Sequence, residues 1–295
     1  MISMDPEHCL PDKLKLAHNF NAAVKDYDDI AILQKTVAER LLEHLELIRI
    51  RPGRILDLGA GTGGSARTLA KRFRQARVVQ LDMAVNMLRY SRGRSPALFS
   101  RQSFVCADAE RLPFPPAAFD MIYSSLVIQW CHYLDDLFAG LRQCLKGSGL
   151  FIFSTLGPDT LHELRESWAS VDDLVHVNTF MDMHDVGDAL IRAGFADPVM
   201  EVEQLTLTYP DVLTLLHDLK HLGVHNVNSG RRQTLTGKTR FENMVAAYES
   251  HRVGNRLPAT YEVVYGHAWV PEIARGGGAE SRFSVIPVAS IKRRG

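Results

Sequence analysis

Glycines and a carboxylate stand close together in ILDLGAGTGGS, residues 55–65. Gly59, Gly61 and Gly64 fit G-x-G-x-x-G, a pattern typical of dinucleotide-binding loops, whereas Gly59, Gly61 and Gly63 fit G-x-G-x-G, a pattern expected for a nucleoside such as S-adenosylmethionine. Glycine has no Cβ, so the backbone can approach a ligand, and a following helix would present free N–H groups. The glycines alone leave both cofactors open.

Of three acidic residues near the loop, two favour S-adenosylmethionine and one suits either cofactor. Asp57 would repel a pyrophosphate, but it can receive the cationic amino group of a methionine moiety, directly or through water. Asp82 can accept hydrogen bonds from the ribose hydroxyls of either cofactor, and Asp108 ends the segment FVCAD within reach of an adenine amine. The expected binding residues for S-adenosylmethionine are Asp57, Gly59, Ala60, Gly61, Gly63, Asp82, Met83, Asp108, Ala109 and Ser125.

Strands and helices alternate around these residues, which predicts a parallel sheet with helices on both faces. The apolar runs predict strands at 54–58, 76–82, 104–108, 119–126 and 149–156 and helices at 64–73, 84–92 and 134–145. A helical period over 30–48 predicts a long amphipathic helix before the first strand. Because ligands bind outside the carboxyl ends of parallel strands, the glycines and carboxylates should meet at one edge.

The alternation loosens beyond residue 156. We expect helices at 160–173, 182–194, 211–223 and 240–252 and strands at 199–209 and 260–270. No internal repeat or clear linker is visible, so residues 1–295 are interpreted as one domain. Its expected parts are an N-terminal helical cap at about 13–50, a nucleotide-binding core at 51–156, a substrate lid with late strands at 157–271 and a flexible tail at 272–295.

Composition narrows the class of protein. The 34 basic and 34 acidic side chains cancel, so nothing global indicates a nucleic-acid or membrane-surface protein. The N-terminus has no apolar signal segment, and no window approaches a membrane-spanning length. The four cysteines have no C-x-x-C spacing and are expected to be reduced thiols. These features predict a cytoplasmic protein without nucleic-acid or membrane partners.

The segment from about 54 to 156 resembles the class I S-adenosylmethionine-dependent methyltransferases. That resemblance implies an α/β, Rossmann-like fold with a mostly parallel seven-stranded sheet, flanking helices and helical lid insertions. From about residue 20 to 271 the chain is also similar to the malonyl-acyl-carrier-protein O-methyltransferases of biotin synthesis, through phrases such as SSLVIQWC, GPDTLHELRESW, DMHDVGDAL and YEVVYGHAW. The family resemblance implies methylation of the free carboxylate of malonyl carrier protein, or of malonyl-CoA, to a methyl ester.

This chemistry needs no general base. Carboxyl groups titrate at about pH 4, so a malonyl carboxylate is ionised near neutral pH and can attack a sulfonium methyl group directly. We therefore expect catalysis by alignment and exclusion of water. Candidate residues that position the substrate are Tyr27, Trp130, His132 and Arg165. Ordinary helix packing for Tyr27 and an exposed helix charge for Arg165 remain open alternatives.

Two histidine-containing patterns invite a metal interpretation that the sequence does not favour. Asp182 in DMHD is well placed to cap a helix that starts near Met183. His217, His221 and His225 lack an accompanying acidic ligand, and we expect no metal.

An acidic carrier protein would need a basic docking patch. The candidates are Arg89, Arg92, Arg94 and Arg101, or Arg231, Arg232, Lys238 and Arg240.

Three other functions remain compatible with the sequence. Complex I assembly proteins, which are thought to hydroxylate an arginine, share similar phrases. A methyltransferase acting on a quinone precursor or on a free carboxylic acid would show the same glycine loop. An assembly factor that holds S-adenosylmethionine only as a structural ligand would also keep Asp57, Asp82 and Asp108.

Overall fold

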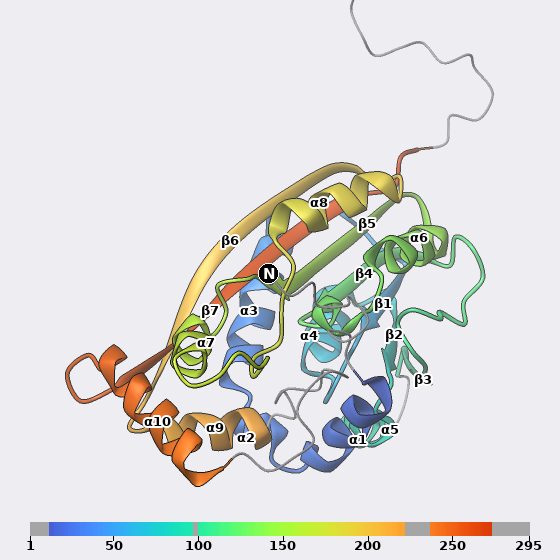
Figure 1. The fold of residues 1–295 in the computed structure, drawn as a ribbon. Coiled ribbons are helices and arrows are strands. Elements are labelled where there is room, and N and C mark those ends of the chain that lie inside the picture. Colours follow the sequence, from blue (N-terminus) through green and yellow to red (C-terminus); the bar gives the residue numbers. More distant parts are fainter. Residues whose placement is uncertain (1–11, 97–99, 222–236, 273–295) are drawn as a thin grey trace, which may run out of the picture.

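A computed structural model of the chain describes residues 12–96, 100–221 and 237–272, and Figure 1 shows its fold. One seven-stranded sheet has the order β3-β2-β1-β4-β5-β7-β6. The strands are β1 (Arg54–Leu58), β2 (Arg77–Asp82), β3 (Gln102–Cys106), β4 (Phe119–Ser125), β5 (Leu145–Leu156), β6 (Ala196–Tyr209) and β7 (Leu257–Trp269). β1 to β5 pair in parallel, whereas β7 pairs antiparallel with both β5 and β6. The predicted fold class is confirmed.

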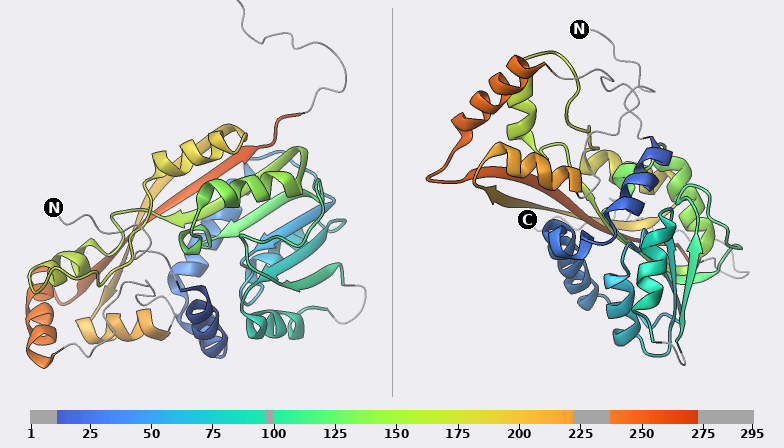
Figure 2. Two further views of the ribbon diagram at one scale, coloured as in Figure 1. Left: turned by 45° about the vertical axis from the view of Figure 1, so that its right-hand side comes forward. Right: turned by 90° about the horizontal axis from the view of Figure 1, so that it is seen from below.

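Helices cover both faces of the sheet, as Figures 1 and 2 show. They are α1 (Lys13–Ala23), α2 (Tyr27–Ile30), α3 (Ile32–Glu46), α4 (Gly64–Arg72), α5 (Val85–Gly93), α6 (Leu134–Cys144), α7 (His162–Ala169), α8 (Met183–Arg192), α9 (Val212–His221) and α10 (Lys238–Tyr248). Leu41 of α3 and Leu69 of α4 pack in the core of one face, whereas Phe138 of α6 and Leu190 of α8 pack in that of the other. Central strands are apolar because both of their faces are covered.

The antiparallel pair of β6 and β7 extends past the parallel part of the sheet, and α7, α9 and α10 lie near its far end (Figure 1). We call these helices, with the segment 170–182 between α7 and α8, the C-terminal lid. The buried carboxylate of Glu163 in α7 accepts hydrogen bonds from the backbone N–H of Thr260 at 3.1 Å and from its hydroxyl at 2.5 Å. The hydroxyl of Tyr248 in α10 donates to the carbonyl of Pro258 at 2.8 Å. These bonds fix the lid to β7.

Several predicted boundaries were wrong. The helix expected over 30–48 starts at Ile32, because Ala31 has a non-helical ψ of 53°. The helix expected over 160–173 starts at His162, because Leu161 has a left-handed φ of 55°. β3 ends at Cys106, so Asp108 lies in the following loop rather than at the strand end. β5 starts earlier than expected, because Leu145 pairs with Phe119 of β4.

Some expectations concern residues outside the described part, namely His225, Arg231, Arg232 and the tail beyond residue 272. Of the helices that the structure describes, none combines the length and the apolar character needed to cross a membrane.

Asp120 of β4 binds the backbone at the amino end of the neighbouring strand β1. Its carboxylate accepts hydrogen bonds from the backbone N–H groups of Gly53 at 2.9 Å and Arg54 at 2.7 Å, and from Lys146 at 2.6 Å. Partial burial raises the pKa of this carboxyl, but the bonds from Lys146 and the two backbone groups outweigh burial and hold the pKa below its usual value. The charged form of Asp120 therefore stabilises the fold.

We predict that Asp120→Asn lowers the free energy of unfolding by about 1.5–3 kcal/mol at pH 7, the typical value for hydrogen bonds to a charged group. A lowered pKa contributes stability above the ordinary carboxyl value of about 4 and loses it as the pH falls through the folded-state pKa. In urea unfolding, the difference in the free energy of unfolding between the wild type and Asp120→Asn should therefore narrow below about pH 4.

Asp135→Asn is the matched control, because Asp135 forms an exposed pair with Arg192 at 2.9 Å. Asp135→Asn should lower the free energy of unfolding by less than about 1 kcal/mol. An equal loss of stability in both variants would contradict the role of Asp120.

Candidate active site

The glycine loop between β1 and α4 has the conformation that its sequence requires. Gly59, Gly61 and Gly63 have φ values of 71°, 53° and 77°. A Cβ on Gly59 would lie 2.1 Å from Cγ2 of Val127, and one on Gly63 would lie 1.9 Å from the hydroxyl of Ser91. Gly64 has no atom within 4 Å of its Cβ position and is the first residue of α4. Thus Gly59, Gly61 and Gly63 shape the loop, whereas Gly64 begins the helix.

Asp82 holds this loop against the end of β2. One carboxylate oxygen accepts a hydrogen bond from the backbone N–H of Gly61 at 2.8 Å, and the other accepts from Ala84 at 2.8 Å. The backbone N–H groups of Gly59 and Ala60 donate to the carbonyl of Leu81 at 2.7 and 3.0 Å. Burial raises the pKa of Asp82, while hydrogen bonds from the backbone N–H groups of Ala84, Gly61 and Met83 oppose the shift. The loop and the start of the next helix are therefore positioned by the same carboxylate.

Asp57 lies at the base of the loop with 2% of its surface exposed. Its Oδ2 atom is buried and has no hydrogen-bond partner within the described structure. Burial, and then the negative charge of Asp82, raise the pKa of Asp57 to about 7, while a backbone hydrogen bond from Ala66 opposes the rise. A buried carboxylate oxygen without a partner fits a site that receives a cation.

A cavity of about 680 Å³ lies at the carboxyl edge of the sheet, between the glycine loop, the N-terminal helices and the C-terminal lid. The predicted residues that line it are Tyr27, Gly59, Ala60, Gly61, Asp82, Met83, Asp108, Ala109, Ser125 and Trp130. Asp57, Gly63, His132 and Arg165 are absent from its wall. Hence the structure brings most of the predicted set together.

Helix α1 covers one end of the cavity through an ion pair of Lys13, which the sequence did not predict, and through the ring of Phe20. The Lys13 ammonium group donates to both carboxylate oxygens of Asp108, at 2.8 and 2.7 Å, and pairs with Glu110. Partial burial raises the pKa of Asp108, but the hydrogen bonds from Lys13 and from the backbone of Glu110, together with the nearby positive charge of Lys13, outweigh burial and lower the pKa. The ring of Phe20 meets Tyr27 and Trp130 edge to face, with centroids 6.4 and 6.3 Å apart. No local sequence pattern joins a lysine of the first helix to the loop after β3.

Arg165 and His132 have partners in the fold itself. The Arg165 guanidinium donates to the carbonyls of Pro158 at 2.8 Å and Thr160 at 2.9 Å, so it holds the turn that precedes α7. The Nδ1 atom of His132 lies 4.0 Å from a carboxylate oxygen of Glu110, and its backbone N–H donates to the same side chain. This geometry favours structural roles for both residues.

Asp182 caps α8, as predicted, by accepting a hydrogen bond from the backbone N–H of His184 at 2.8 Å. Across residues 12–96, 100–221 and 237–272, no three histidine, cysteine or acidic side chains are grouped so that they could hold a metal ion.

Known proteins resemble the chain in both sequence and fold. A family described as "Methyltransferase domain" matches residues 56–153. A malonyl-[acyl-carrier protein] O-methyltransferase of Gallionella capsiferriformans is 49% identical over 91% of this chain and 95% of its own length. The protein of the same name from Laribacter hongkongensis is 48% identical, over 88% and 90%.

Solved structures share the fold at low identity. Phosphoethanolamine N-methyltransferase 2 of Haemonchus contortus, solved with S-adenosylhomocysteine, superposes with a TM-score of 0.51 at 21% identity over 79% of this chain and 53% of its own. A second structure of that enzyme, solved with S-adenosyl-L-methionine, gives a TM-score of 0.51 at 22% identity over the same shares.

We predict that Gly59→Ala weakens binding of S-adenosylhomocysteine at least about tenfold in calorimetric titration, because a left-handed φ alone costs an L-residue about 1–2 kcal/mol. The clash with Val127 adds to this cost. Gly140→Ala is the matched control, because Gly140 lies within α6 with open space at its Cβ position. It should leave binding unchanged and stabilise the protein by up to about 1 kcal/mol.

We also predict that S-adenosylhomocysteine binds more tightly as the pH rises toward about 7, because below this pH the Asp57 carboxyl of the free protein is mostly protonated. The ligand's ammonium group favours the ionised carboxyl, so binding releases the proton. The measurements should extend no higher than about pH 7, because the α-amino group of the ligand titrates at about 8 and would begin to lose its charge. Asp57→Asn should flatten the profile and Asp135→Asn should keep it. A wild-type profile in Asp57→Asn would refute the role of Asp57.

Proposed function

The chain belongs to the family of malonyl-[acyl-carrier protein] O-methyltransferases, and we propose that it methylates the free carboxylate of malonyl carrier protein to the methyl ester. S-adenosylmethionine, when bound, supplies an electrophilic methyl group on a sulfonium centre. The observation that carries the proposal is a cavity that joins the glycine loop to the C-terminal lid. Malonyl-CoA presents the same carboxylate on a smaller thiol and is an alternative acceptor.

The residues of the glycine-loop end fit the cofactor. Gly59, Ala60 and Gly61 offer a backbone surface without bulky side chains, and Asp82 lies at the end of β2, where a carboxylate can accept from ribose hydroxyls. The partnerless Oδ2 atom of Asp57 suits an ammonium group. The remaining proposed contacts, beside the adenine and the reacting centre, are Gly63, Met83, Asp108, Ala109 and Ser125.

The described wall of the cavity contains no histidine, and its thiol is protonated at neutral pH and so cannot accept a proton. Burial, followed by the charge of Glu110, raises the pKa of the Cys131 thiol to about 12. Burial also raises the pKa of Tyr27, with further contributions from Asp82 and Asp28. Neither side chain therefore serves as a base. The acceptor carboxylate is already ionised, so the chain's contribution is to align it and exclude water, effects worth up to about 7–11 kcal/mol.

Tyr27 and Trp130 are the proposed positioning residues at the reacting centre. Both line the cavity, and Phe20 contacts both rings. Aromatic side chains with little rotational freedom restrict a bound carboxylate without adding a competing charge. His132 and Arg165 act at most through neighbouring residues, because Arg165 donates to the carbonyls of Pro158 and Thr160 and His132 lies beside Glu110.

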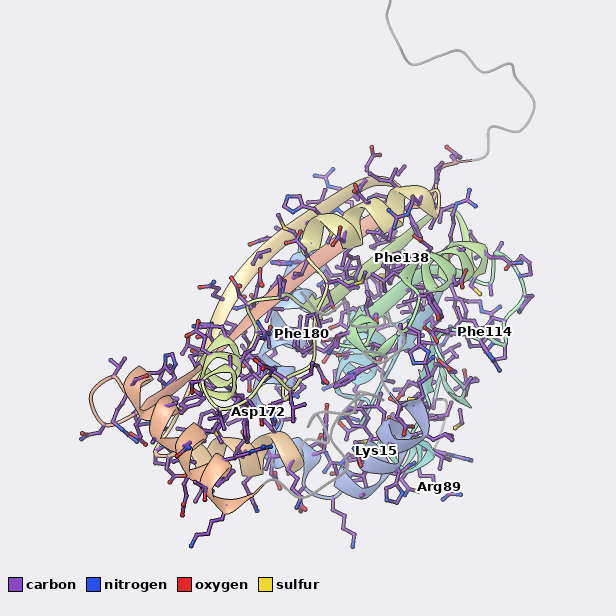
Figure 3. All side chains as sticks on the ribbon, in the orientation of Figure 1. Lys15, Arg89, Phe114, Phe138, Asp172 and Phe180 are labelled. Atoms are coloured by element: carbon purple, nitrogen blue, oxygen red, sulfur yellow. The ribbon has the colours of Figure 1, made fainter. Side chains whose placement is uncertain are left out.

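A carrier protein would dock by charge complementarity. Arg94 is paired with Asp28 at 2.6 Å, and Arg101 donates to the carbonyl of Gln75 at 2.8 Å, so both are engaged within the fold. Arg89 and Arg92 are exposed on α5, and Figure 3 shows Arg89 at the same end of the molecule as Lys15 of α1. Arg89 and Arg92 are therefore the members of the first basic cluster that, within the described structure, are not bound to a carboxylate or a backbone carbonyl and can meet an acidic partner.

The methyl ester removes the charge of the malonyl group, which fits an early step of biotin synthesis, in which the disguised chain elongates toward a pimeloyl methyl ester. We further propose a cytoplasmic location. Cys106, Cys131 and Cys144 are free thiols, which a reducing compartment maintains.

We predict that the protein, incubated with methyl-labelled S-adenosylmethionine and malonyl carrier protein, forms a base-labile methyl ester. Acetyl carrier protein is the matched control, because it lacks the free carboxylate and should remain unlabelled. Faster transfer to succinyl carrier protein or to free malonate would overturn the proposed acceptor. An absence of transfer to every acid, together with intact S-adenosylhomocysteine binding, would favour a non-enzymatic role.

A further inference from the structure

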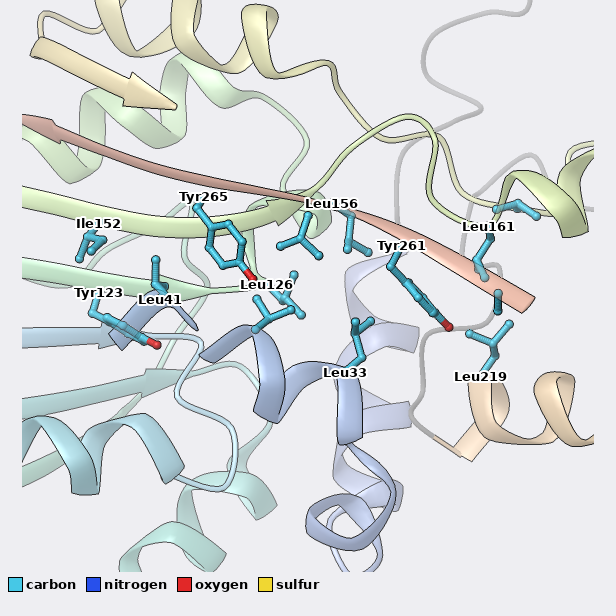
Figure 4. Close-up of a cluster of buried hydrophobic side chains, with 14 of the residues drawn as sticks. Leu33, Leu41, Tyr123, Leu126, Ile152, Leu156, Leu161, Leu219, Tyr261 and Tyr265 are labelled. Carbon is cyan, nitrogen blue, oxygen red and sulfur yellow. The ribbon is translucent and has the colours of Figure 1, made fainter. Parts of the chain in front are cut away.

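The cavity continues beyond the glycine loop as an apolar branch, which we call the acceptor branch. Its wall is formed by Leu33 of α3, Leu156 of β5, Leu161, Leu219 of α9 and Tyr261 of β7. All belong to one hydrophobic cluster, and Figure 4 shows them converging from these separate elements. The branch can therefore hold an apolar chain.

Two carboxamides line the same cavity with unused hydrogen-bonding capacity. The Oε1 atom of Gln34 and the Oδ1 atom of Asn178 are buried without a partner in the part of the chain that the structure describes. A third lining carboxamide, Gln129, differs: its amide nitrogen donates to the carbonyl of Leu126 at 2.9 Å, and its oxygen accepts from the hydroxyl of Thr155 at 3.3 Å. Since buried polar atoms are normally paired, Gln34 and Asn178 point to a ligand that carries donors.

The positive charges around the cavity argue against an anionic ligand within the branch. Lys13 is bonded to Asp108, the ammonium of Lys35 donates to the carbonyl of Asp28, and Arg67 donates to that of Thr62. Arg94 is paired with Asp28. Every cation among the described lining residues thus has a partner in the N-terminal helices, the glycine loop or the loop after β3.

The chemistry of the acceptor supplies the missing donors. A malonyl carboxylate only accepts hydrogen bonds, so it cannot satisfy a carboxamide oxygen. The pantetheine arm that links a malonyl group to a carrier protein or to coenzyme A has two secondary amides, each with an N–H donor, separated by apolar groups. The cofactor's ammonium group is a donor too, but the partnerless Asp57 carboxylate is the better match for a cation.

We propose that the acceptor branch binds the pantetheine arm of the acceptor thioester, with the carboxamide oxygens of Gln34 and Asn178 accepting hydrogen bonds from its amide N–H groups. The inference rests on the proposed carboxyl methylation and adds the part of the acceptor that is recognised. The apolar wall packs against the arm's methyl and methylene groups. Recognition of the arm would distinguish carrier-linked malonate from free dicarboxylic acids.

The test compares two acceptors, malonyl-pantetheine and the malonyl thioester of ethanethiol, which lacks both amides. In the double variant Gln34→Leu/Asn178→Leu, we expect the KM for malonyl-pantetheine to rise about 10- to 50-fold, because two hydrogen bonds to the ligand are lost. The KM for the ethyl thioester should change less than about twofold, as should the Kd for S-adenosylhomocysteine, since neither ligand uses these bonds. Circular dichroism checks that the variant is folded.

Gln129→Leu is the matched control, because it removes a lining carboxamide whose bonds lie within the protein. It should change the KM of both thioesters in the same proportion. An equal rise for both thioesters in the double variant would overturn the proposal, and so would a parallel loss of S-adenosylhomocysteine affinity, which would assign the two residues to the cofactor.

A binding measurement separates this inference from the proposed function. In calorimetric titration, S-acetylpantetheine should bind the wild type and bind the double variant about 10- to 50-fold more weakly. This result would support the acceptor branch even if no malonyl thioester were methylated. Equal binding by wild type and double variant would refute it, whatever the activity.

Discussion

The hydrogen bonds of the Asp82 carboxylate hold the site together. One oxygen accepts from the glycine loop at Gly61, and the other accepts from Ala84 before α5. Parallel pairing of β1 with β2 brings the two segments to one edge of the sheet, so a single side chain can order both. Burial of this carboxylate raises its pKa, and the backbone donors at Ala84, Gly61 and Met83 oppose that shift without cancelling it.

Two coverings from distant parts of the sequence complete the cavity on this edge. Helix α1 is joined to the loop after β3 by Lys13 and Asp108, and the C-terminal lid is fixed to β7 by Glu163 and Thr260. The parallel strands alone would leave a shallow edge. With both coverings present, the cavity can align an acceptor with the cofactor and exclude water, which is the main requirement of a transfer that needs no base.

The described structure divides the cavity into a polar end and an apolar branch. The polar end uses backbone groups and carboxylates to suit a cofactor that carries donors and a positive charge, whereas the acceptor branch uses leucines and carboxamides. No catalytic base is needed where the two parts meet, because the acceptor carboxylate is already ionised near neutral pH. The acceptor brings its own charge, and strong cations beside that charge would lower its nucleophilicity.

The sequence by itself determined the alternating strands, the left-handed glycines and the order of Asp57, Asp82 and Asp108, because local periodicity and backbone sterics set these features. Tertiary structure alone decided that Lys13 meets Asp108, that Arg165 holds a turn instead of lining the cavity, and that Gln34 faces the same space as Asn178. These contacts join residues far apart in the chain. Their physical cause is the packing of whole elements, which no local spacing encodes.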